Sequence, residues 1–568
     1  MATTGSQPSP TDLLPLSGRG TLGVGFPARW RRGRRLPPFV IWAPALIVVL
    51  LMAMPLVYLV LRASEAGSDV WRLVFRERTA TVFRNTAWLA ATVATASAII
   101  AVPLAWLTTR TDLPLRRFWA TVATLPLVIP SYVGALTIIA ALGPRGLVQE
   151  SLAGPLGIER LPSIYGFPGA WLTLTLFTFP YVFLSVRTAL VGLDPALEEA
   201  SRCLGRGSWR TFFGCVLPQL RPAIATGALL SALYTISDFG VVTLLRYDVF
   251  TRAVYVQYRS SFDRSLAAAL ALLLVLFAIV LLLAEAAIRG RSVYHRSGAG
   301  TARRQRAIHL GRWRWPALAF CGAVLALSLL LPLAVLLYWL ARGLSGGAGA
   351  DRLWSSISHS ITAGGLAALA AAIAALPVAV LAVRFRGRLS AAMERATYLG
   401  YALPGIVIAL AFVFVGANYL TPLYQTLGLL IVAYVVRFLP QAVGAERLSL
   451  LQVSPRLEEA ARTLGRSSLG AIVAVTLPLA RPGMLAGAAL VFLTVMKELP
   501  ITLLLSPIGF DTLATDIWSA TGSGSFAEAA VPALTLIAIS ALPTVLASVR
   551  GGRSIDRPAL PSAPAMRQ

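Results

Sequence analysis

Long apolar runs recur along the whole chain and constrain its fold more than any other feature. A helix needs about 20 apolar residues to cross the hydrocarbon core of a bilayer. Twelve runs are long enough, near 39–63, 86–109, 118–142, 168–190, 219–245, 266–288, 315–341, 360–383, 396–418, 422–446, 480–506 and 530–549. The 568 residues are 57% hydrophobic and 13% charged, whereas soluble domains are about 25% charged. The composition excludes a soluble enzyme and a disordered chain, and it predicts an all-α integral membrane protein.

Arginine is concentrated in every second connection between these runs. The chain has 50 Lys+Arg and 24 Asp+Glu. With the N-terminus inside, the inner segments carry nearly all of this excess, and 289–314 alone has eight arginines and no acid. The positive-inside rule therefore favours both termini in the cytoplasm. Inner loops account for the basic charge, so we expect lipid and no nucleic acid as a partner. The polar first 37 residues end in arginines, so we expect a cytoplasmic tail and no secretory signal peptide.

The chain also contains an internal repeat. The segment LEEASRCLGRGSWRTFFGCVLPQLRP (197–222) matches LEEAARTLGRSSLGAIVAVTLPLARP (457–482) at 13 of 26 positions, with an offset of 260 residues. Farther upstream the offset becomes 274 and pairs Arg110 with Arg384. Each half has six predicted spans, so both halves enter the membrane in the same sense, as a parallel repeat. We expect an N-terminal tail (1–37), a first transmembrane domain (38–290), an Arg-rich cytoplasmic linker (291–314), a second transmembrane domain (315–550) and a C-terminal tail (551–568).

Each copy of the repeated segment predicts a short helix on the inner side. Asp194-Pro195 and Ser454-Pro455 are typical of an N-cap followed by a proline at the first helical position. Two glutamates follow in the first turn, where acids suit the helix dipole. Gly205 and Gly465 then end the helix, because glycine adopts the left-handed conformation without strain. A second short helix leads into the next span, so each half presents a compact docking element.

This pattern, EEA followed by glycine and later by LP, resembles the EAA loop in permease subunits of ATP-binding-cassette (ABC) importers. The resemblance covers most of the chain and occurs at corresponding positions in both halves. It implies the type I ABC importer (MetI-like) permease fold, in which the loop inserts into a cleft of the ATPase subunit and transmits its closure. It also implies a multi-pass protein of the bacterial plasma (inner) membrane. The resemblance implies ATPase-coupling roles for Glu198, Glu199, Ala200 and Gly205 in the first half and for Glu458, Glu459, Ala460 and Gly465 in the second.

The sequence contains no site for ATP hydrolysis. A phosphate-binding loop of the form GxxxxGK[ST] needs its lysine, and Lys497, the only lysine in the chain, lies in an apolar segment. The three histidines and three cysteines form no metal-ligand or catalytic pattern. We therefore expect no cofactor, no metal and no catalytic residue. The ATPase, two copies by the resemblance, must be a separate polypeptide.

Four ionisable residues lie within the predicted spans, where charge is costly and marks a cavity or a partner. They are Asp238, Arg437, Lys497 and Glu498. Asp238 and Glu498 correspond under the offset of 260, and Gly240 and Pro500 beside them favour broken or kinked helices. Two interpretations stay open. The acids, with Arg437 and Lys497 beside them, line or gate a transport pathway, or the residues are structural, as pairs of Lys497 or Arg437 with a carboxylate or as snorkelling residues at a helix end.

The cargo is indicated by resemblance alone. The stretches 237–255 and 496–518 are similar to those of fused permeases of ferric-iron importers, which implies an extracytoplasmic binding protein that delivers the metal. Fused thiamine permeases share this architecture and are the alternative. An ion-gradient-driven secondary transporter also has parallel halves, but it has no need of a repeated docking loop.

Overall fold

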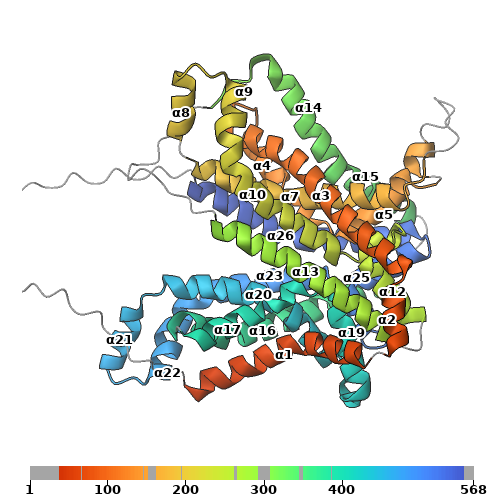
Figure 1. Cartoon of the computed structure of the whole chain (residues 1–568), viewed down its shortest axis with the longest axis vertical. Coiled ribbons are helices and arrows are strands. Elements are labelled where there is room, and N and C mark those ends of the chain that lie inside the picture. Colours follow the sequence, from red (N-terminus) through yellow and green to blue (C-terminus); the bar gives the residue numbers. More distant parts are fainter. Residues whose placement is uncertain are drawn as a thin grey trace, which may run out of the picture. The chain divides into compact units, whose positions relative to one another are not determined.

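The computed structural model describes residues 38–65, 67–144, 146–150, 162–193, 195–260, 265–291, 307–344, 350–385 and 387–555. In these residues the chain is helical throughout, apart from turns and one isolated β-bridge between Thr111 and Ile308 (Figure 1). The tails 1–37 and 556–568, Asp194 and most of the predicted linker lie outside the described residues. The expectation of an all-α fold is confirmed for the described part.

Among the described residues, the first half has five helices of more than 20 residues, with shorter ones between them. The long ones are α1 (Phe39–Ser64), α3 (Glu77–Arg110), α7 (Phe167–Gly192), α10 (Leu217–Ser237) and α13 (Ser265–Arg291). The shorter ones are α2 (Ser68–Val74), α4 (Arg116–Val122), η1 (Leu125–Val128), α5 (Ser131–Leu142), α8 (Pro195–Cys203), α9 (Ser208–Thr211), η2 (Phe212–Val216), α11 (Gly240–Leu244) and α12 (Phe250–Ser260).

The second half follows the same order. It begins with η3 (Gly311–Trp313), α14 (Arg314–Leu325), η4 (Ala326–Leu330) and α15 (Leu331–Leu344). It continues with α16 (Ala350–Arg384), α17 (Arg388–Thr397), α18 (Leu399–Ala402), α19 (Gly405–Asn418), η5 (Thr421–Leu423) and α20 (Leu427–Gln452). It ends with α21 (Pro455–Thr463), α22 (Ser468–Ala471), η6 (Ile472–Thr476), α23 (Leu477–Val495), α24 (Pro500–Leu505), α25 (Leu513–Gly522) and α26 (Phe526–Ile555).

Ten helices of the described part are long and apolar enough to cross a membrane. Two shorter apolar helices, Gly405–Asn418 and Phe526–Ala541, lie where the remaining two spans were predicted. The chain is therefore a multi-pass membrane protein, but the predicted count of twelve crossing helices is not established.

Four of the twelve predicted spans are interrupted. The expectation of continuous helices at 118–142 and 396–418 is wrong, because each breaks before Pro130 or Pro404 and resumes as α5 or α19. Pro130 and Pro404 directly precede the first residue of the new helix, where the missing N–H of proline costs no helical hydrogen bond. The breaks expected near Gly240 and Pro500 are confirmed: α10 ends at Ser237 before α11, and α23 ends at Val495 before α24.

The internal repeat is confirmed in the helix boundaries. Both ends of α7 recur in α20 at an offset of 260, and α3 and α16 end at Arg110 and Arg384. The π-helical turns η2 and η6 also correspond at an offset of 260. The close packing recurs too. A Cβ at Gly227 would lie 2.6 Å from the backbone of Val182, and one at Gly487 would lie 3.2 Å from that of Ala442.

The first helix of each half packs against helices of both halves. In the second half α1 contacts α16, α17 and α19, and in the first half it contacts α13. Reciprocally, α14 contacts α3, and α15 contacts both α5 and α26. Cys321 and Ala317 of α14 are buried in one apolar cluster with residues of α3 such as Leu104. The two halves are thus interleaved rather than merely placed side by side.

Candidate functional site

The two EAA segments fold into matching short helices, α8 and α21. Each is followed by a glycine with positive φ, +79° at Gly205 and +88° at Gly465. The N–H of Arg206 donates to the carbonyl of Ser201, and that of Arg466 donates to the carbonyl of Ala461. This six-to-one bond defines a Schellman end, which requires a left-handed residue and favours glycine. At the other end Ser454 is the N-cap of α21 as predicted, but its hydroxyl makes no capping hydrogen bond; the predicted N-cap Asp194 lies outside the described residues.

The C-terminal end of each short helix is exposed and partly apolar. Leu204 is 82% exposed and Leu464 is 85% exposed. Nearby in the first half, Trp209 is 71% exposed in α9. Large apolar side chains at such exposure favour contact with another protein. Glu199, Ala200, Glu459 and Ala460 are exposed as well, so these four predicted coupling residues lie where a partner can reach them.

Glu198 and Glu458, the first glutamates of each pair, instead point inward. In the first half, Arg110 Nη2 at the end of α3 lies 3.2 Å from Glu198 Oε1, and these side chains are 5% and 13% exposed. In the second half, Arg384 Nε at the end of α16 donates to Glu458 Oε1 at 2.6 Å. Ion pairs this far from water hold their partners firmly, because separating them leaves a poorly solvated charge. Each short helix is thereby fixed to the second long helix of its own half.

The two ion pairs differ in their further partners. The Thr476 hydroxyl in η6 donates to Glu458 Oε1 at 2.5 Å, and Arg384 Nη2 donates to the carbonyl of Val453 at 3.1 Å. The residue that corresponds to Thr476 in the first half is Val216, which has no hydroxyl. Glu198 has a second cation instead, with Arg202 Nη2 3.8 Å from Oε2. The glutamate is therefore held by more hydrogen bonds in the second half than in the first.

Sequence reasoning missed the anchoring arginines and Thr476. Arg110 and Arg384 were used only to align the repeat, although a charged residue retained at the end of an apolar span was itself a signal. The inward direction of Glu198 and Glu458 depends on Arg110 and Arg384, which lie beside α8 and α21 in space but far from them in the chain. The local pattern does not contain these distant partners.

Asp238 lies in the break between α10 and α11. Its carboxylate accepts a hydrogen bond from the hydroxyl of Ser131 at 2.5 Å and one from the N–H of Val241 at 2.9 Å. The backbone N–H groups at the start of a helix suit a negative charge. Asp238 therefore joins the start of α11 to the start of α5.

Glu498 occupies the corresponding break between α23 and α24. Its Oε2 lies 3.2 Å from Arg437 Nε, and its Oε1 accepts from the N–H of Ile501 at 3.4 Å. The residue that corresponds to Ser131 is Gly405, where a Cβ would lie 2.6 Å from Glu498 Oε1. Glycine thus leaves room for an arginine where the first half has a serine. The structure brings Arg437 and Glu498 together, as the pairing interpretation expects.

Lys497 does not join this pair. Its ammonium donates to the backbone carbonyl of Leu127 in η1, in the first half, at 3.2 Å. An ammonium has three N–H donors and is compatible with carbonyl oxygens. Lys497 therefore links the break in α23–α24 to the break in α4–α5 across the two halves.

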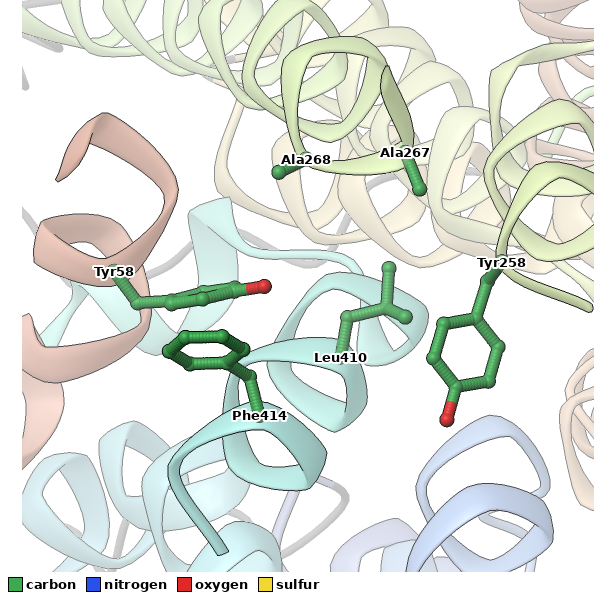
Figure 2. A pocket seen from close by; sticks show the side chains of 6 residues that line it. All are labelled: Tyr58, Tyr258, Ala267, Ala268, Leu410 and Phe414. Atoms are coloured by element: carbon green, nitrogen blue, oxygen red, sulfur yellow. The ribbon is translucent and has the colours of Figure 1, made fainter. Parts of the chain in front are cut away.

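A small pocket lies between α1, α12, α13 and α19 and is lined by Tyr58, Tyr258, Ala267, Ala268, Leu410 and Phe414 (Figure 2). The rings of Tyr58 and Phe414 face each other, with centroids 4.7 Å apart. Its cavity volume of about 10 Å³ has room for roughly one water molecule. In the described part of the chain no three His, Cys, Asp or Glu residues are grouped so as to hold a metal ion.

Comparison with known proteins gives consistent results. The family described as "Binding-protein-dependent transport system inner membrane component" matches residues 98–292 and 371–550, one match in each half. An Fe(3+)-transport system permease protein of Haemophilus influenzae is 34% identical over 517 residues, which is 90% of this chain and 98% of that protein. A putative ferric transport system permease protein of the same organism is 27% identical over 76% of this chain and 71% of its own length. A molybdenum transport system permease protein of Escherichia coli is 35% identical over 24% of this chain and 58% of its own length.

Proposed function

Because this chain belongs to the family of inner membrane components of binding-protein-dependent transport systems, we propose that it is the permease of a ferric-iron importer. It is an ABC importer permease, a transport subunit whose relatives are named as permease proteins. Separate ATPase subunits, two copies in our proposal, bind α8 and α21. A binding protein outside the membrane delivers the cargo, and both termini lie in the cytoplasm.

The observation that carries the ATPase partnership is the pair of anchored short helices. Each presents an exposed leucine and an exposed glutamate to a partner, and each is tied by an inward glutamate to the end of a long helix. A push on α8 is transmitted through Arg110 to α3, which packs along α7 and α10. A push on α21 reaches α16, α20 and α23 in the same way through Arg384.

The transport cycle follows from this mechanical link. ATP binding draws the two ATPase subunits together, and the short helices move with them. Segments that follow two of the breaks, α5 and α19, pack on α15 and α1 of the other half. Moving the halves apart or together therefore changes access at those breaks. Hydrolysis lets the halves return, so access alternates between the two sides of the membrane.

Ferric iron is proposed as cargo because the relative that aligns with 90% of this chain is named for Fe(3+) transport. The intramembrane carboxylates do not add to this argument. Asp238 and Glu498 are each engaged by a side chain and a backbone N–H of their own half. We infer that they brace the helix breaks and that iron passes without a tight site of carboxylate ligands in the permease.

The test is uptake of radioactive iron into proteoliposomes that contain the full chain, its ATPase and an iron-binding protein. We expect uptake that needs ATP and all three components, and unlabelled thiamine in excess should not compete. The matched variant is Leu204→Asp with Leu464→Asp, which alters the exposed faces of α8 and α21 without touching the membrane part. It should abolish uptake while the protein stays folded in the membrane.

Two results would overturn this proposal in different ways. Uptake driven by an ion gradient without the ATPase would identify a secondary transporter. ATP-dependent uptake of thiamine rather than iron would keep the ABC mechanism and reject the cargo.

A further inference from the structure

The end of the linker, residues 307–310, is bonded to the turn that follows α3. The N–H of Ile308 donates to the carbonyl of Arg110 at 2.8 Å, and the N–H of Asp112 donates to the carbonyl of Ile308 at 3.1 Å. With the bridge between Thr111 and Ile308, this is a short piece of parallel β-structure in a helical chain. We call residues 307–310 the linker strand.

The side chain of Asp112 closes the same contact. Its Oδ1 accepts from the N–H of Leu310 at 2.9 Å, and its Oδ2 lies 2.5 Å from His309 Nδ1. The backbone N–H of Leu310 lowers the pKa of Asp112, so this carboxylate is charged at neutral pH. Leu310 also packs on the apolar cluster shared by α3 and α14.

The contact lies directly beside the anchor of the first short helix. Arg110, whose carbonyl accepts from Ile308, is the residue whose guanidinium lies 3.2 Å from Glu198 of α8. Fixing the backbone at Arg110 therefore restricts where its side chain can place Glu198. The linker strand is continuous with η3 and α14, which belong to the second half.

The second anchor is supported differently. There Glu458 accepts from both Arg384 and the hydroxyl of Thr476, and the same arginine also donates to Val453. The first half has Val216 in place of Thr476, and Arg110 Nε and Nη2 have no hydrogen-bond partner among the described residues. The half with fewer hydrogen bonds at its glutamate is the half to which the linker strand is hydrogen-bonded.

We propose that the linker strand positions α8, which we call the first coupling helix, as α21 is the second. The strand's hydrogen bonds to the backbone at Arg110 would compensate for the hydroxyl that the Arg110–Glu198 pair lacks. Ile308 and Asp112 are positioning residues, since they act on Glu198 through Arg110. The second coupling helix, α21, therefore depends on hydrogen bonds within its own half. The first, α8, also depends on the linker strand, which leads into the second half. This inference extends the proposed function, because it concerns the same coupling helices.

The experiment compares hydrogen exchange of the backbone in residues 195–204 and 455–464, using the full chain in lipid nanodiscs. Ile308→Pro removes the N–H that donates to Arg110, and Ile308→Ala keeps that N–H as the matched control. We expect Ile308→Pro to speed exchange in 195–204 by roughly three- to tenfold and to leave 455–464 unchanged. Asp112→Ala should act in the same direction, and Asp112→Asn, which keeps the acceptor for Leu310, should act less.

A rescue tests the idea of replacement. Val216→Thr introduces the hydroxyl found at Thr476, so adding it to Ile308→Pro should bring exchange in 195–204 back towards that of the unaltered chain. The number of ATP molecules hydrolysed per cargo molecule should rise in Ile308→Pro and fall again with the rescue. Unchanged exchange in Ile308→Pro, an equal effect in Ile308→Ala, or no rescue by Val216→Thr would each overturn the inference.

Hydrogen exchange separates this inference from the proposed function, because it needs neither ATPase nor cargo. If exchange responds as expected and iron is not transported, the positioning role stands and the cargo is wrong. If iron is transported and exchange does not respond, the positioning role is wrong and the proposed function stands.

Discussion

Glu198 and Glu458 have the same sequence context, yet their side chains meet different surroundings. Both face an arginine at the end of a long helix. In the second half the hydroxyl of Thr476 also donates a hydrogen bond to the glutamate, whereas the corresponding Val216 of the first half has no donor. Both halves keep the glutamate–arginine pair, but among the described residues only the second has a hydroxyl beside it. The short helix of the second half is therefore held more firmly than that of the first.

Replacing Thr476 with valine tests this difference at one atom. The change keeps the shape of the side chain and removes the donor to Glu458, which is worth about 1 kcal/mol for a part-buried hydrogen bond. Hydrogen exchange in residues 455–464 should become roughly fivefold faster. Residues 195–204 serve as the internal control, and a change of equal size there would contradict the local explanation.

At the scale of the elements, each short helix ends on a glycine whose surroundings would accommodate a side chain but whose backbone requires a positive φ. A Cβ at Gly205 or Gly465 would meet no atom within 4 Å, so the constraint is the positive φ alone. Residues with a Cβ avoid this conformation, although asparagine tolerates it better than most. The residue at this position therefore determines how stable the turn is and how well the exposed end of the short helix is held in place.

Substituting these glycines should uncouple ATP hydrolysis from transport. Gly205→Glu with Gly465→Glu combines backbone strain with a new charge at the docking face, and we expect it to remain in the membrane and to lose nearly all uptake. Gly205→Asn with Gly465→Asn should retain a larger share of uptake. The measurements are uptake, ATPase rate and the amount of protein in the membrane, and full transport by the glutamate variant would disprove the coupling role.

The broken helices are the second feature at this scale. Asp238 and Glu498 each bind a backbone N–H at the start of the helix after the break, and each also binds a side chain from a neighbouring segment. The same two breaks thus use two different solutions, serine in one half and arginine with glycine in the other.

Neutral substitutions separate bracing from cargo binding. Asp238→Asn and Glu498→Gln keep one acceptor oxygen, so we expect Asp238→Asn to retain most uptake and Glu498→Gln to lose thermal stability, because Arg437 is left without its counter-charge. Adding Arg437→Gln should recover part of that stability. Iron uptake against iron concentration is the second measurement, and a large rise in KM with normal stability would instead indicate cargo binding.

At the scale of the whole molecule, the two short helices belong to halves that are related by the repeat and packed into one another. Lys497 reaches from one half to the carbonyl of Leu127 in the other, close to both breaks. In the proposed cycle, closing of the ATPase subunits brings α8 and α21 towards each other while this central region rearranges.

This motion is measurable with one native thiol. Cys203 is exposed at the end of α8, and Thr463 is its counterpart at the end of α21. In a chain with Thr463→Cys and the other two cysteines replaced, a bifunctional thiol reagent should link the two positions faster when ATP binds the assembled complex. Thr463→Ser in the same background is the control, and equal linking with and without ATP would contradict the proposed closure.

Sequence alone predicted the helical membrane fold, the duplication and the exposed glycine-ended helices, because these depend on local composition and spacing. It also indicated the breaks beside Gly240 and Pro500, although it treated 118–142 and 396–418 as continuous despite Pro130 and Pro404. It did not predict that Glu198 points at Arg110 or that α1 packs on α16. Those contacts join residues far apart in the chain, and no periodic pattern within one segment records them.

The interleaved packing of the first helices has a consequence for whether either half can fold without the other. Neither half contains the full set of neighbours for its own opening helix, since α1 rests on α16 and α17, and α15 rests on α5. A gene truncated after the first half would yield a product whose opening helix lacks those neighbours, unless a second copy supplied equivalents. Each half is therefore structurally incomplete without the other, and a substitution that destabilises one half also removes support from the other.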